Sequence, residues 1–293
     1  MKGPILLFGA KGQLGSELTC LAAERGEDIV GLSRAEADIA DAAAVEAAIA
    51  RARPRLIVNA AAYTAVDKAE SDIEAAARGN VAGPATLAAA ANAASVPLVH
   101  ISTDYVFDGS KSGAYVEDDP IAPLGVYGRT KAEGETAVRT AAPRHVVIRT
   151  AWVYGPHGAN FLKTILRLAA ERDELRVVAD QRGCPTSTRD LAAAVLAVDH
   201  AVAGGAGPWG TYHFAGKGAT TWHGFACAIV EAQAPLTGKR PPVRAISTSD
   251  YPTPARRPAN SELDSSRFAK AFGYAAAPWR ERASEVVGVL LGR

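Results

Sequence analysis

Short apolar runs alternate with helical patterns through the first half of the chain. The runs are strand-sized and cover residues 4–9, 28–33, 55–61, 97–102 and 145–150. After the first run, Leu14, Leu18 and Leu21 recur at helical spacing, and Gly26 ends the pattern. Strands that are apolar throughout and alternate with helices are typical of a parallel sheet covered on both faces. The sequence therefore predicts an α/β protein with a Rossmann-type doubly wound parallel sheet.

Two further helices are expected between the later strands. Asp41 stands as an N-cap before the alanine-rich segment 42–52, and Pro54 follows it. The segment 78–95 also has a helical pattern, which we expect to be interrupted near Gly83 and Pro84.

The second half of the chain is less regular. After Trp152, proline and glycine become frequent and short strand and helix signals alternate. We expect residues 1–152 to form a dinucleotide-binding domain and residues 153–293 mainly a smaller α+β domain that binds substrate. A strong helical pattern over 187–203 is expected to return to the first domain.

Composition narrows the function classes. Hydrophobic residues make up 48% of the 293 residues, enough for a sizeable core, and 32 basic against 31 acidic residues give a net charge of +1. That balance argues against nucleic acid or an anionic membrane as a partner. Three widely spaced cysteines suit a reducing cytoplasm, and six scattered histidines do not form a metal-ligand motif, so no metal is expected.

A glycine-rich turn follows the first predicted strand. Gly9, Gly12 and Gly15 are spaced as GxxGxxG, and Gln13 and Leu14 open the helix. Glycines allow a tight turn and close approach of a pyrophosphate, which the N–H groups and dipole of a helix start favour. The turn predicts dinucleotide binding, although such spacing alone is also found in purely structural turns.

We expect the residues at the end of the second predicted strand to contact the adenosine ribose of the coenzyme. Many NAD-binding proteins carry Asp or Glu there, whereas this chain has Ser33 and Arg34. Serine does not repel a 2′-phosphate and arginine can bind one, so the pair favours NADPH, with NADH possible. The alternative is that Arg34 is only a solvated surface charge.

Other residues are expected along the same coenzyme. Asp38 and Ile39 follow the second strand and would lie near the adenine. Ala62, Tyr63 and Thr64 follow the third strand and would lie along the rest of the coenzyme.

The stretch "GVYGRTKAEGE" carries the candidate chemistry. Tyr127 and Lys131 are one helical turn apart, so they share a face, while Ser102, Thr103 and Asp104 end the fourth predicted strand. Lowering a tyrosine pKa by about 3 units takes about 4 kcal/mol, which a lysine cation about 4 Å away can supply. The alternative is an amphipathic helix with an incidental tyrosine and lysine.

Together with "NAAAYTAVDKAE", "STDYVFDG", "RTAWVYG", "DQRGCPTS" and "YPTPARRPANSELD", these motifs span nearly the whole chain. The set resembles the extended short-chain dehydrogenase/reductase family and, within it, the dTDP-4-dehydrorhamnose reductase family. The resemblance implies a coenzyme-dependent oxidoreductase that moves a hydride from the reduced nicotinamide to C4 of a nucleotide-activated 4-keto-6-deoxy sugar.

The resemblance also implies roles for single residues. Tyr127 would donate a proton to the carbonyl oxygen, Lys131 would lower its pKa and hold the nicotinamide ribose, and Thr103 would hydrogen-bond the reacting oxygen.

Substrate contacts follow from the same resemblance. Thr103, Asp104 and Trp152 match substrate-contact positions, and Arg257 is a candidate for the phosphates, with a salt bridge between the two halves as its alternative.

In one respect the chain departs from a family pattern. Some such reductases are paired through a metal at acidic residues, and Glu17 and Asp190 could match two of these positions, but the last residues lack a clear third carboxylate. The sequence therefore predicts no metal and either a monomer or a homodimer.

Two other functions stay open. The chain could reduce or epimerise another nucleotide 4-ketosugar, or it could be a non-enzymatic regulatory subunit on the same fold, because fold alone does not fix function.

Overall fold

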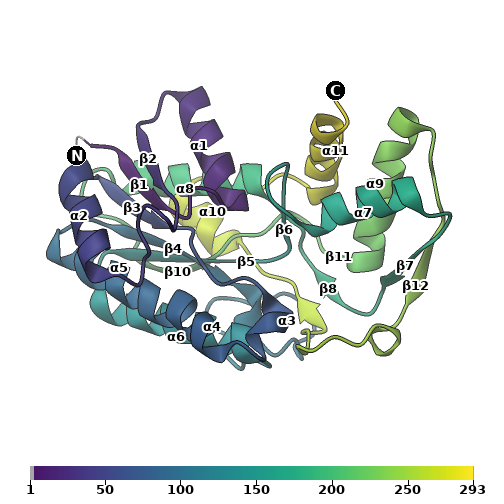
Figure 1. Ribbon diagram of the computed structural model, residues 1–293, viewed down its shortest axis with the longest axis horizontal. Coiled ribbons are helices and arrows are strands. Elements are labelled where there is room, and N and C mark those ends of the chain that lie inside the picture. The colour runs from purple at the N-terminus through teal and green to yellow at the C-terminus, as the bar shows by residue number, and fades with distance from the viewer. Residues whose placement is uncertain (1–2, 293) are drawn as a thin grey trace.

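The computed structural model describes residues 3–292, and its largest layer is a six-stranded sheet (Figure 1). Neighbouring strands are all parallel. From one edge to the other the order is β2 (Ile29–Leu32), β1 (Ile5–Phe8), β3 (Leu56–Asn59), β4 (Leu98–Thr103), β5 (His145–Thr150) and β10 (Gly210–His213). The strand order turns around at β1 and β3, which confirms the predicted doubly wound α/β class.

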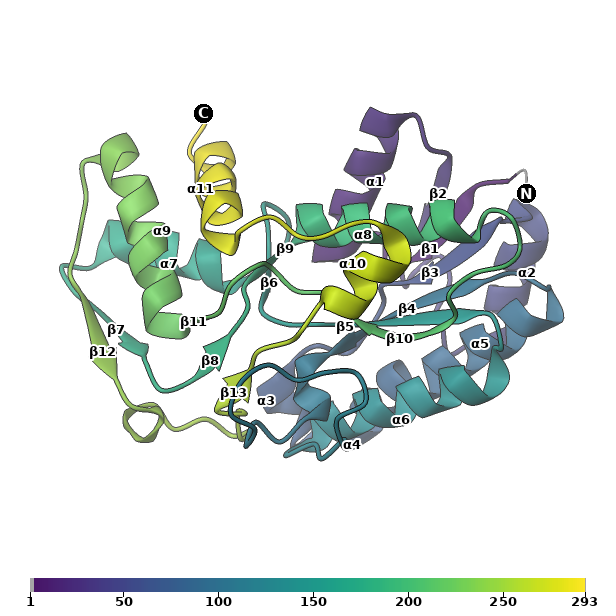
Figure 2. The same cartoon turned by 180° about the vertical axis from the view of Figure 1, so that it is seen from behind.

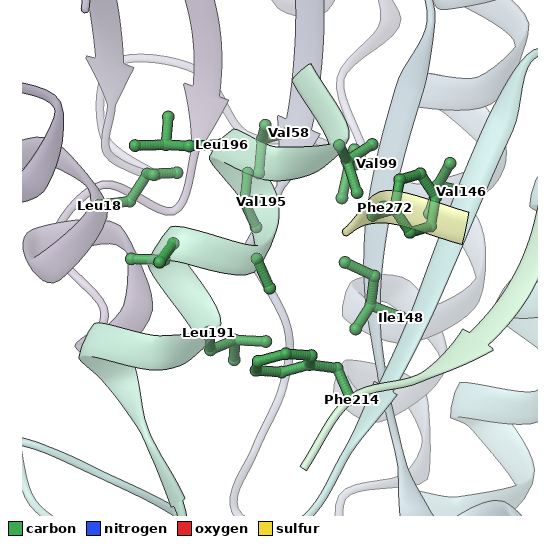
Figure 3. Packing of buried hydrophobic residues seen from close by; sticks show 14 of the residues in the cluster. Leu18, Val58, Val99, Val146, Ile148, Leu191, Val195, Leu196, Phe214 and Phe272 are labelled. Carbon is green, nitrogen blue, oxygen red and sulfur yellow. The ribbon is translucent and has the colours of Figure 1, made fainter. Parts of the chain in front are cut away.

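Alternate side chains of each strand enter opposite cores. Ile5 and Leu7 of β1 pack on one side, whereas Leu6 and Phe8 pack on the other, and all four are fully buried. This explains why the strands lack polar alternation: the sheet has no solvent face. Figure 3 shows the first core, where Leu18, Leu191 and Leu196 meet sheet residues such as Val58 and Val99.

Helices cover both faces of the sheet (Figure 2). One face carries α1 (Gln13–Arg25), α8 (Thr188–Val202) and α10 (Ser266–Phe272). The opposite face carries α2 (Ala42–Ala52), α5 (Gly83–Ala93) and α6 (Val126–Ala141). Two of these, α8 and α10, come from the second half of the chain, as does β10, so the second half contributes to the first layer.

The segment before α5 contains the irregularity expected near Gly83 and Pro84, in the form of a π-helical turn. Helices α3 (Val66–Ala69) and α4 (Ile73–Ala77) lead into a π-helical turn, η1 (Arg78–Ala82), which runs directly into α5. The helix changes from π to α at Gly83, close to the expected interruption, but the chain stays helical through Pro84. Pro84 is the second residue of α5, where proline is tolerated, and a Cβ on Gly83 would meet Ile39 Cδ1 at 2.5 Å, so the Ile39 side chain would have to shift.

The rest of the chain forms a second lobe beside the sheet, on the right in Figure 1. Its core is built from α7 (Phe161–Glu171), α9 (Trp222–Thr237) and α11 (Trp279–Leu290), packed with the parallel pair β7 (Leu175–Val178) and β12 (Val243–Ile246). Short strands join the lobe to the sheet: β6 (Val153–Tyr154), β8 (Arg182–Gly183), β9 (Thr186–Ser187), β11 (Thr220–Thr221) and β13 (Asn260–Ser261). Two short 3₁₀ turns complete the chain, η2 (Asp104–Val106) and η3 (Thr248–Asp250). Within residues 3–292 no helix has the length and apolar character needed to span a bilayer.

Candidate active site

The turn between β1 and α1 is closed by its glycines. Gly9 has a φ of +87°, and a Cβ there would meet the backbone N of Ala61 at 2.6 Å. A Cβ on Gly15 would lie 2.2 Å from the carbonyl oxygen of Gly9. The amide of Gly12 donates to that same oxygen at 2.9 Å. Side chains at positions 9 and 15 would therefore force the turn open.

No side chain of the described residues caps the start of α1. Its N-cap is Gly12, which has no side chain to satisfy the first N–H groups, and the first turn contains no acidic residue. Leu14 is buried in the core, whereas the Gln13 side chain accepts a hydrogen bond from Asn160 at 3.0 Å. An uncapped helix start suits an anion, and pyrophosphate binding at this turn stays a prediction.

At the end of β2, Ser33 is buried and Arg34 is exposed. The Ser33 side chain is already engaged, because its hydroxyl and its backbone N–H both donate to Glu36, at 2.6 and 2.8 Å. Arg34 lies 3.5 Å from the carboxylate of Asp38 and is 81% exposed, so it is free to turn toward a ligand.

Asp38 and Ile39 lie just beyond that strand end. Asp38 accepts hydrogen bonds from the amide of Ala40 at 3.0 Å and from Arg78 at 2.9 Å. Ile39 is buried against α5. The Asp38 side chain thus ties the loop after β2 to the π-helical turn η1.

The loop after β3 is held by a residue that the sequence analysis missed. Ala62 and Thr64 are exposed and Tyr63 is half-buried, and fully buried Asn80 accepts from the amide of Tyr63 at 2.9 Å and donates to its carbonyl at 3.1 Å. Asn80 also donates to the Thr130 hydroxyl on α6 at 3.2 Å. The sequence did contain a signal for this role, because Asn80 is a polar residue within a mostly apolar helical segment.

The carboxyl end of β4 presents Thr103 and Asp104, both buried. The Thr103 hydroxyl donates to Asp104 Oδ1 at 3.0 Å and accepts from the amide of Tyr105 at 3.2 Å. Asp104 Oδ2 is buried and no side chain of the described residues lies in hydrogen-bonding geometry to it. Burial raises the pKa of Asp104 to about 6, and the nearby hydroxyls of Ser261 and Thr103 act in the opposite direction. An unpaired buried carboxylate oxygen at a strand end is suited to receive a hydroxyl group.

Close backbone approaches fix α6, which carries Tyr127 and Lys131. A Cβ on Gly128 would lie 2.1 Å from the carbonyl oxygen of Tyr105, and one on Gly134 would lie 2.0 Å from that of Asn80. These glycines let the helix pack directly against the 3₁₀ turn η2, which follows β4, and against the turn η1.

The helix start is fixed in a similar way. Glu70 caps it by accepting from the amide of Val126 at 2.8 Å, and Gly125 leaves space for that carboxylate.

Tyr127 meets the strand end, but its acidity differs from the expectation. Burial raises the pKa of Tyr127 to about 12; the Thr103 hydroxyl acts in the opposite direction, and the charge of Asp104 adds to the rise. The ring also packs edge-on against Tyr105, with centroids 5.4 Å apart. The expectation that Lys131 lowers this pKa is therefore wrong: burial is the largest influence, and Lys131 does not contribute to the shift.

Lys131 is directed toward β4. Its ammonium group donates to the carbonyl of Ile101 at 2.7 Å. Burial lowers the pKa of Lys131 to about 8, and the carboxylate of Glu135 acts in the opposite direction. Lys131 therefore still carries most of its charge at neutral pH.

Glu135 and Arg149 form a buried pair that the sequence analysis did not identify. Arg149 donates to both carboxylate oxygens of Glu135, at 2.9 and 2.8 Å, and Ser102 donates to the same carboxylate at 2.6 Å. The pair connects α6, β5 and β4 one turn beyond Lys131. The glutamate four residues after the lysine was a signal, but its partner on β5 could not be read from spacing.

The ring of Trp152 packs against Trp222 and Gly183 of the second lobe. Its ring stacks on Trp222 with centroids 3.5 Å apart, and its backbone has a φ of +50°. A Cβ on Gly183 would lie 2.5 Å from the Trp152 ring, so the glycine permits this contact. A non-glycine residue held at positive φ marks a position where the surroundings dictate the side-chain direction.

Arg257 is engaged in a salt bridge between the two halves of the chain. Its guanidinium donates to both carboxylate oxygens of Asp67, one of them at 2.8 Å, and to the carbonyl of Ala255 at 2.8 Å. This is the arrangement that the sequence analysis held as the alternative to phosphate binding.

The acidic residues considered for a metal are occupied by other partners. Glu17 accepts from Thr188 at 3.0 Å, and Asp190 accepts from Arg282 at 3.0 Å. Within residues 3–292, the side chains of Glu27, Asp199 and His200 are close enough to share an ion. Arg55 already binds both of these carboxylates and supplies a positive charge there.

Comparisons with known proteins agree along almost the whole chain. Residues 1–291 match the family described as RmlD substrate binding domain. A dTDP-4-dehydrorhamnose reductase of Sinorhizobium fredii is 44% identical over 289 residues, covering 98% of this chain and 97% of the relative. A crystal structure of a Clostridium acetobutylicum dTDP-4-dehydrorhamnose reductase is 38% identical, with a TM-score of 0.90 and coverage of 98% and 99%. The Bacillus anthracis enzyme of the same name, solved in complex with NADP, is 33% identical, with a TM-score of 0.90 and coverage of 99% of both chains.

Proposed function

From the membership of this chain in the dTDP-4-dehydrorhamnose reductase family, to which it belongs over nearly its full length, we propose that it reduces the C4 keto group of dTDP-4-dehydro-L-rhamnose to give dTDP-L-rhamnose. The protein is accordingly an oxidoreductase. The observation that carries the proposal is the meeting of Tyr127, Thr103 and Asp104 at the carboxyl end of β4, in the same molecule as the glycine turn.

NADPH is the coenzyme that we assign to the site, and a relative with the same fold was solved with NADP. The backbone of Gly12, Gln13 and Gly15 would hold the pyrophosphate, and the loop of Ala62, Tyr63 and Thr64 would line the coenzyme further on. When bound, the reduced nicotinamide supplies the hydride. The chain's own residues have to place the ketone and deliver the proton.

Tyr127 is the proton donor in this proposal. Because burial raises its pKa to about 12, the hydroxyl is fully protonated at neutral pH and ready to donate. The oxygen of the reduced carbonyl is a stronger base than a phenolate, so the transfer from Tyr127 is downhill. A raised pKa is therefore compatible with the assigned role, although the sequence analysis expected a lowered one.

Two neighbours support that proton transfer. Thr103 is placed to hydrogen-bond the reacting oxygen through its hydroxyl, which now donates to Asp104. Lys131 is placed to stabilise the phenolate that Tyr127 leaves behind and to bind the nicotinamide ribose, in exchange for its bond to Ile101. In this scheme Lys131 acts on the charge that develops during the reaction.

Three other residues complete the substrate site as we propose it. Asp104 receives a sugar hydroxyl at its unpaired oxygen, and Trp152 presents part of its ring to the sugar. Arg257 reaches a substrate phosphate only by giving up part of its pair with Asp67, which makes it the weakest assignment of the set.

The test is an absorbance assay of NADPH oxidation with dTDP-4-dehydro-L-rhamnose. The proposal expects one NADPH consumed for each sugar reduced. An epimerase acting on the same sugar would convert it without net loss of NADPH. A non-enzymatic regulatory subunit would leave both sugar and coenzyme unchanged.

Two further expectations concern the setting of the enzyme. We propose a cytoplasmic location, which the free thiols of Cys20, Cys184 and Cys227 support. A nucleotide sugar is the expected small-molecule partner, and a monomer or homodimer is the expected assembly.

A further inference from the structure

The carboxylate of Glu36 folds back onto the end of β2. One of its oxygens accepts two hydrogen bonds from Ser33, from the hydroxyl at 2.6 Å and from the backbone N–H at 2.8 Å. The amide of Glu36 in turn donates to the carbonyl of Ser33 at 3.0 Å, which closes a tight turn. Glu36 itself is exposed, so no packing requires its side chain to point there.

This position matters for the coenzyme. In doubly wound folds the end of the second strand lies beside the adenosine ribose, where an acidic residue selects the 2′-hydroxyl of NAD and an arginine accommodates the 2′-phosphate of NADP. Ser33 stands at this position in the sequence, which by itself favours NADPH. In the structure, the carboxylate of Glu36, three residues further along the chain, accepts hydrogen bonds from both donors of Ser33. It thereby adds a negative charge at this position.

We propose that Glu36 sets the coenzyme preference of this enzyme: its carboxylate takes the Ser33 donors that a 2′-phosphate would use and weighs against NADPH relative to NADH. The inference rests on the proposed function, since it assumes that the coenzyme occupies this end of the sheet.

The charges around Glu36 explain why NADPH can still bind. Lys11 and Arg51 lie near enough to help lower the pKa of Glu36, although its hydrogen bonds with Ser33 contribute more. Arg34 is exposed beside the same turn. When a 2′-phosphate enters, Glu36 has to swing out, and these cations then face the phosphate in its place. The enzyme should therefore accept both coenzymes, with Glu36 reducing the advantage of the phosphorylated one.

The experiment compares binding of NADPH and NADH, which differ only in the 2′-phosphate. Dissociation constants are measured by titrating the nicotinamide fluorescence with the wild-type chain and with Glu36→Gln, which keeps the size but removes the charge. Glu46→Gln, at an exposed glutamate on α2, is the matched control for the loss of one negative charge. No ketosugar is needed, so coenzyme selection is measured apart from catalysis.

We expect Glu36→Gln to shift the ratio of the two dissociation constants about fivefold toward NADPH, since a carboxylate and a phosphate about 5 Å apart in a solvated site repel each other by about 1 kcal/mol. Glu46→Gln should leave the ratio within about twofold. If Glu36→Gln leaves the ratio unchanged or moves it toward NADH while both coenzymes bind, the role of Glu36 is overturned and the proposed function stands. If neither coenzyme binds the wild-type chain, the proposed function itself fails.

Discussion

Arg149 on β5 binds Glu135 on α6 through two hydrogen bonds, at 2.9 and 2.8 Å, and neither side chain reaches solvent. The pair lies directly behind the candidate active site, because Glu135 follows Lys131 by one helical turn. A buried ion pair adds little net stability compared with apolar packing, but removing one partner leaves an uncompensated charge. The position of α6 therefore depends on both partners being present.

Glu135→Gln should destabilise the protein by about 3–5 kcal/mol, because Arg149 would keep its charge in a buried site without its partner. Urea unfolding measures the loss. Glu133→Gln is the matched control on the exposed side of the same helix and should change the free energy of unfolding by less than about 0.5 kcal/mol. Equal effects of the two changes would show that the pair does not hold α6.

The two later glycines of the first turn should separate stability from coenzyme binding. Gly15→Ala places a Cβ 2.2 Å from the Gly9 carbonyl oxygen, so it should destabilise the fold by about 1–3 kcal/mol. Gly12→Ala brings its Cβ to 3.3 Å from that oxygen, a tight contact that a small shift relieves at this exposed position, so the melting temperature should fall much less than in Gly15→Ala. Because its Cβ would lie where the pyrophosphate approaches, NADPH should bind about tenfold more weakly. Unchanged NADPH affinity in Gly12→Ala would place the coenzyme elsewhere.

The role of Thr103 can be tested with a pair of substitutions. Thr103→Val keeps the shape but removes the hydroxyl, and it should lower kcat by about 10–100-fold, the cost of one transition-state hydrogen bond of about 1.5–3 kcal/mol. Thr103→Ser retains the hydroxyl and should restore most of the rate. Steady-state kinetics with both variants decides the point. A threonine that served only packing would give the opposite ranking.

Stability should fall in mild acid because of His213. Burial and the nearby charge of Arg149 lower the pKa of His213 from 6.5 to about 4, so the unfolded chain takes up a proton in this range and the folded protein does not. The free energy of unfolding should therefore decrease as the pH drops from about 6.5 to about 4, by up to about 3 kcal/mol from this group. His213→Gln, measured by urea unfolding across that range, should flatten the dependence. If the free energy of unfolding of His213→Gln changed with pH as steeply as that of the wild type, the acid sensitivity would belong to other groups.

The sequence was most informative where local pattern and backbone geometry decide the structure. The apolar runs located β1 to β5, and the glycine spacing located the turn before α1, because both depend on residues close together in the chain. The same local reasoning located an irregularity near Gly83 and Pro84 but not its form. The chain stays helical there, and a π-helical turn passes directly into α5.

Contacts between distant residues were beyond the sequence. The spacing of residues placed Glu135 on α6 but could not identify Arg149 as its partner. Likewise, the partner of Arg257 is Asp67 from α3, far away in the sequence. Burial was the other missing quantity. It raises the pKa of Tyr127 and lowers that of Lys131, and no pattern of residue types shows how deeply a helix face is covered.

The measurement that tests the central claim most directly is the turnover of Tyr127→Phe with NADPH and dTDP-4-dehydro-L-rhamnose. Removing a positioned general acid should lower kcat by about 10²–10⁴-fold, while the dissociation constant of NADPH stays within about threefold of the wild-type value. A phenylalanine variant that turns over at the wild-type rate would contradict the assignment of Tyr127 as the proton donor.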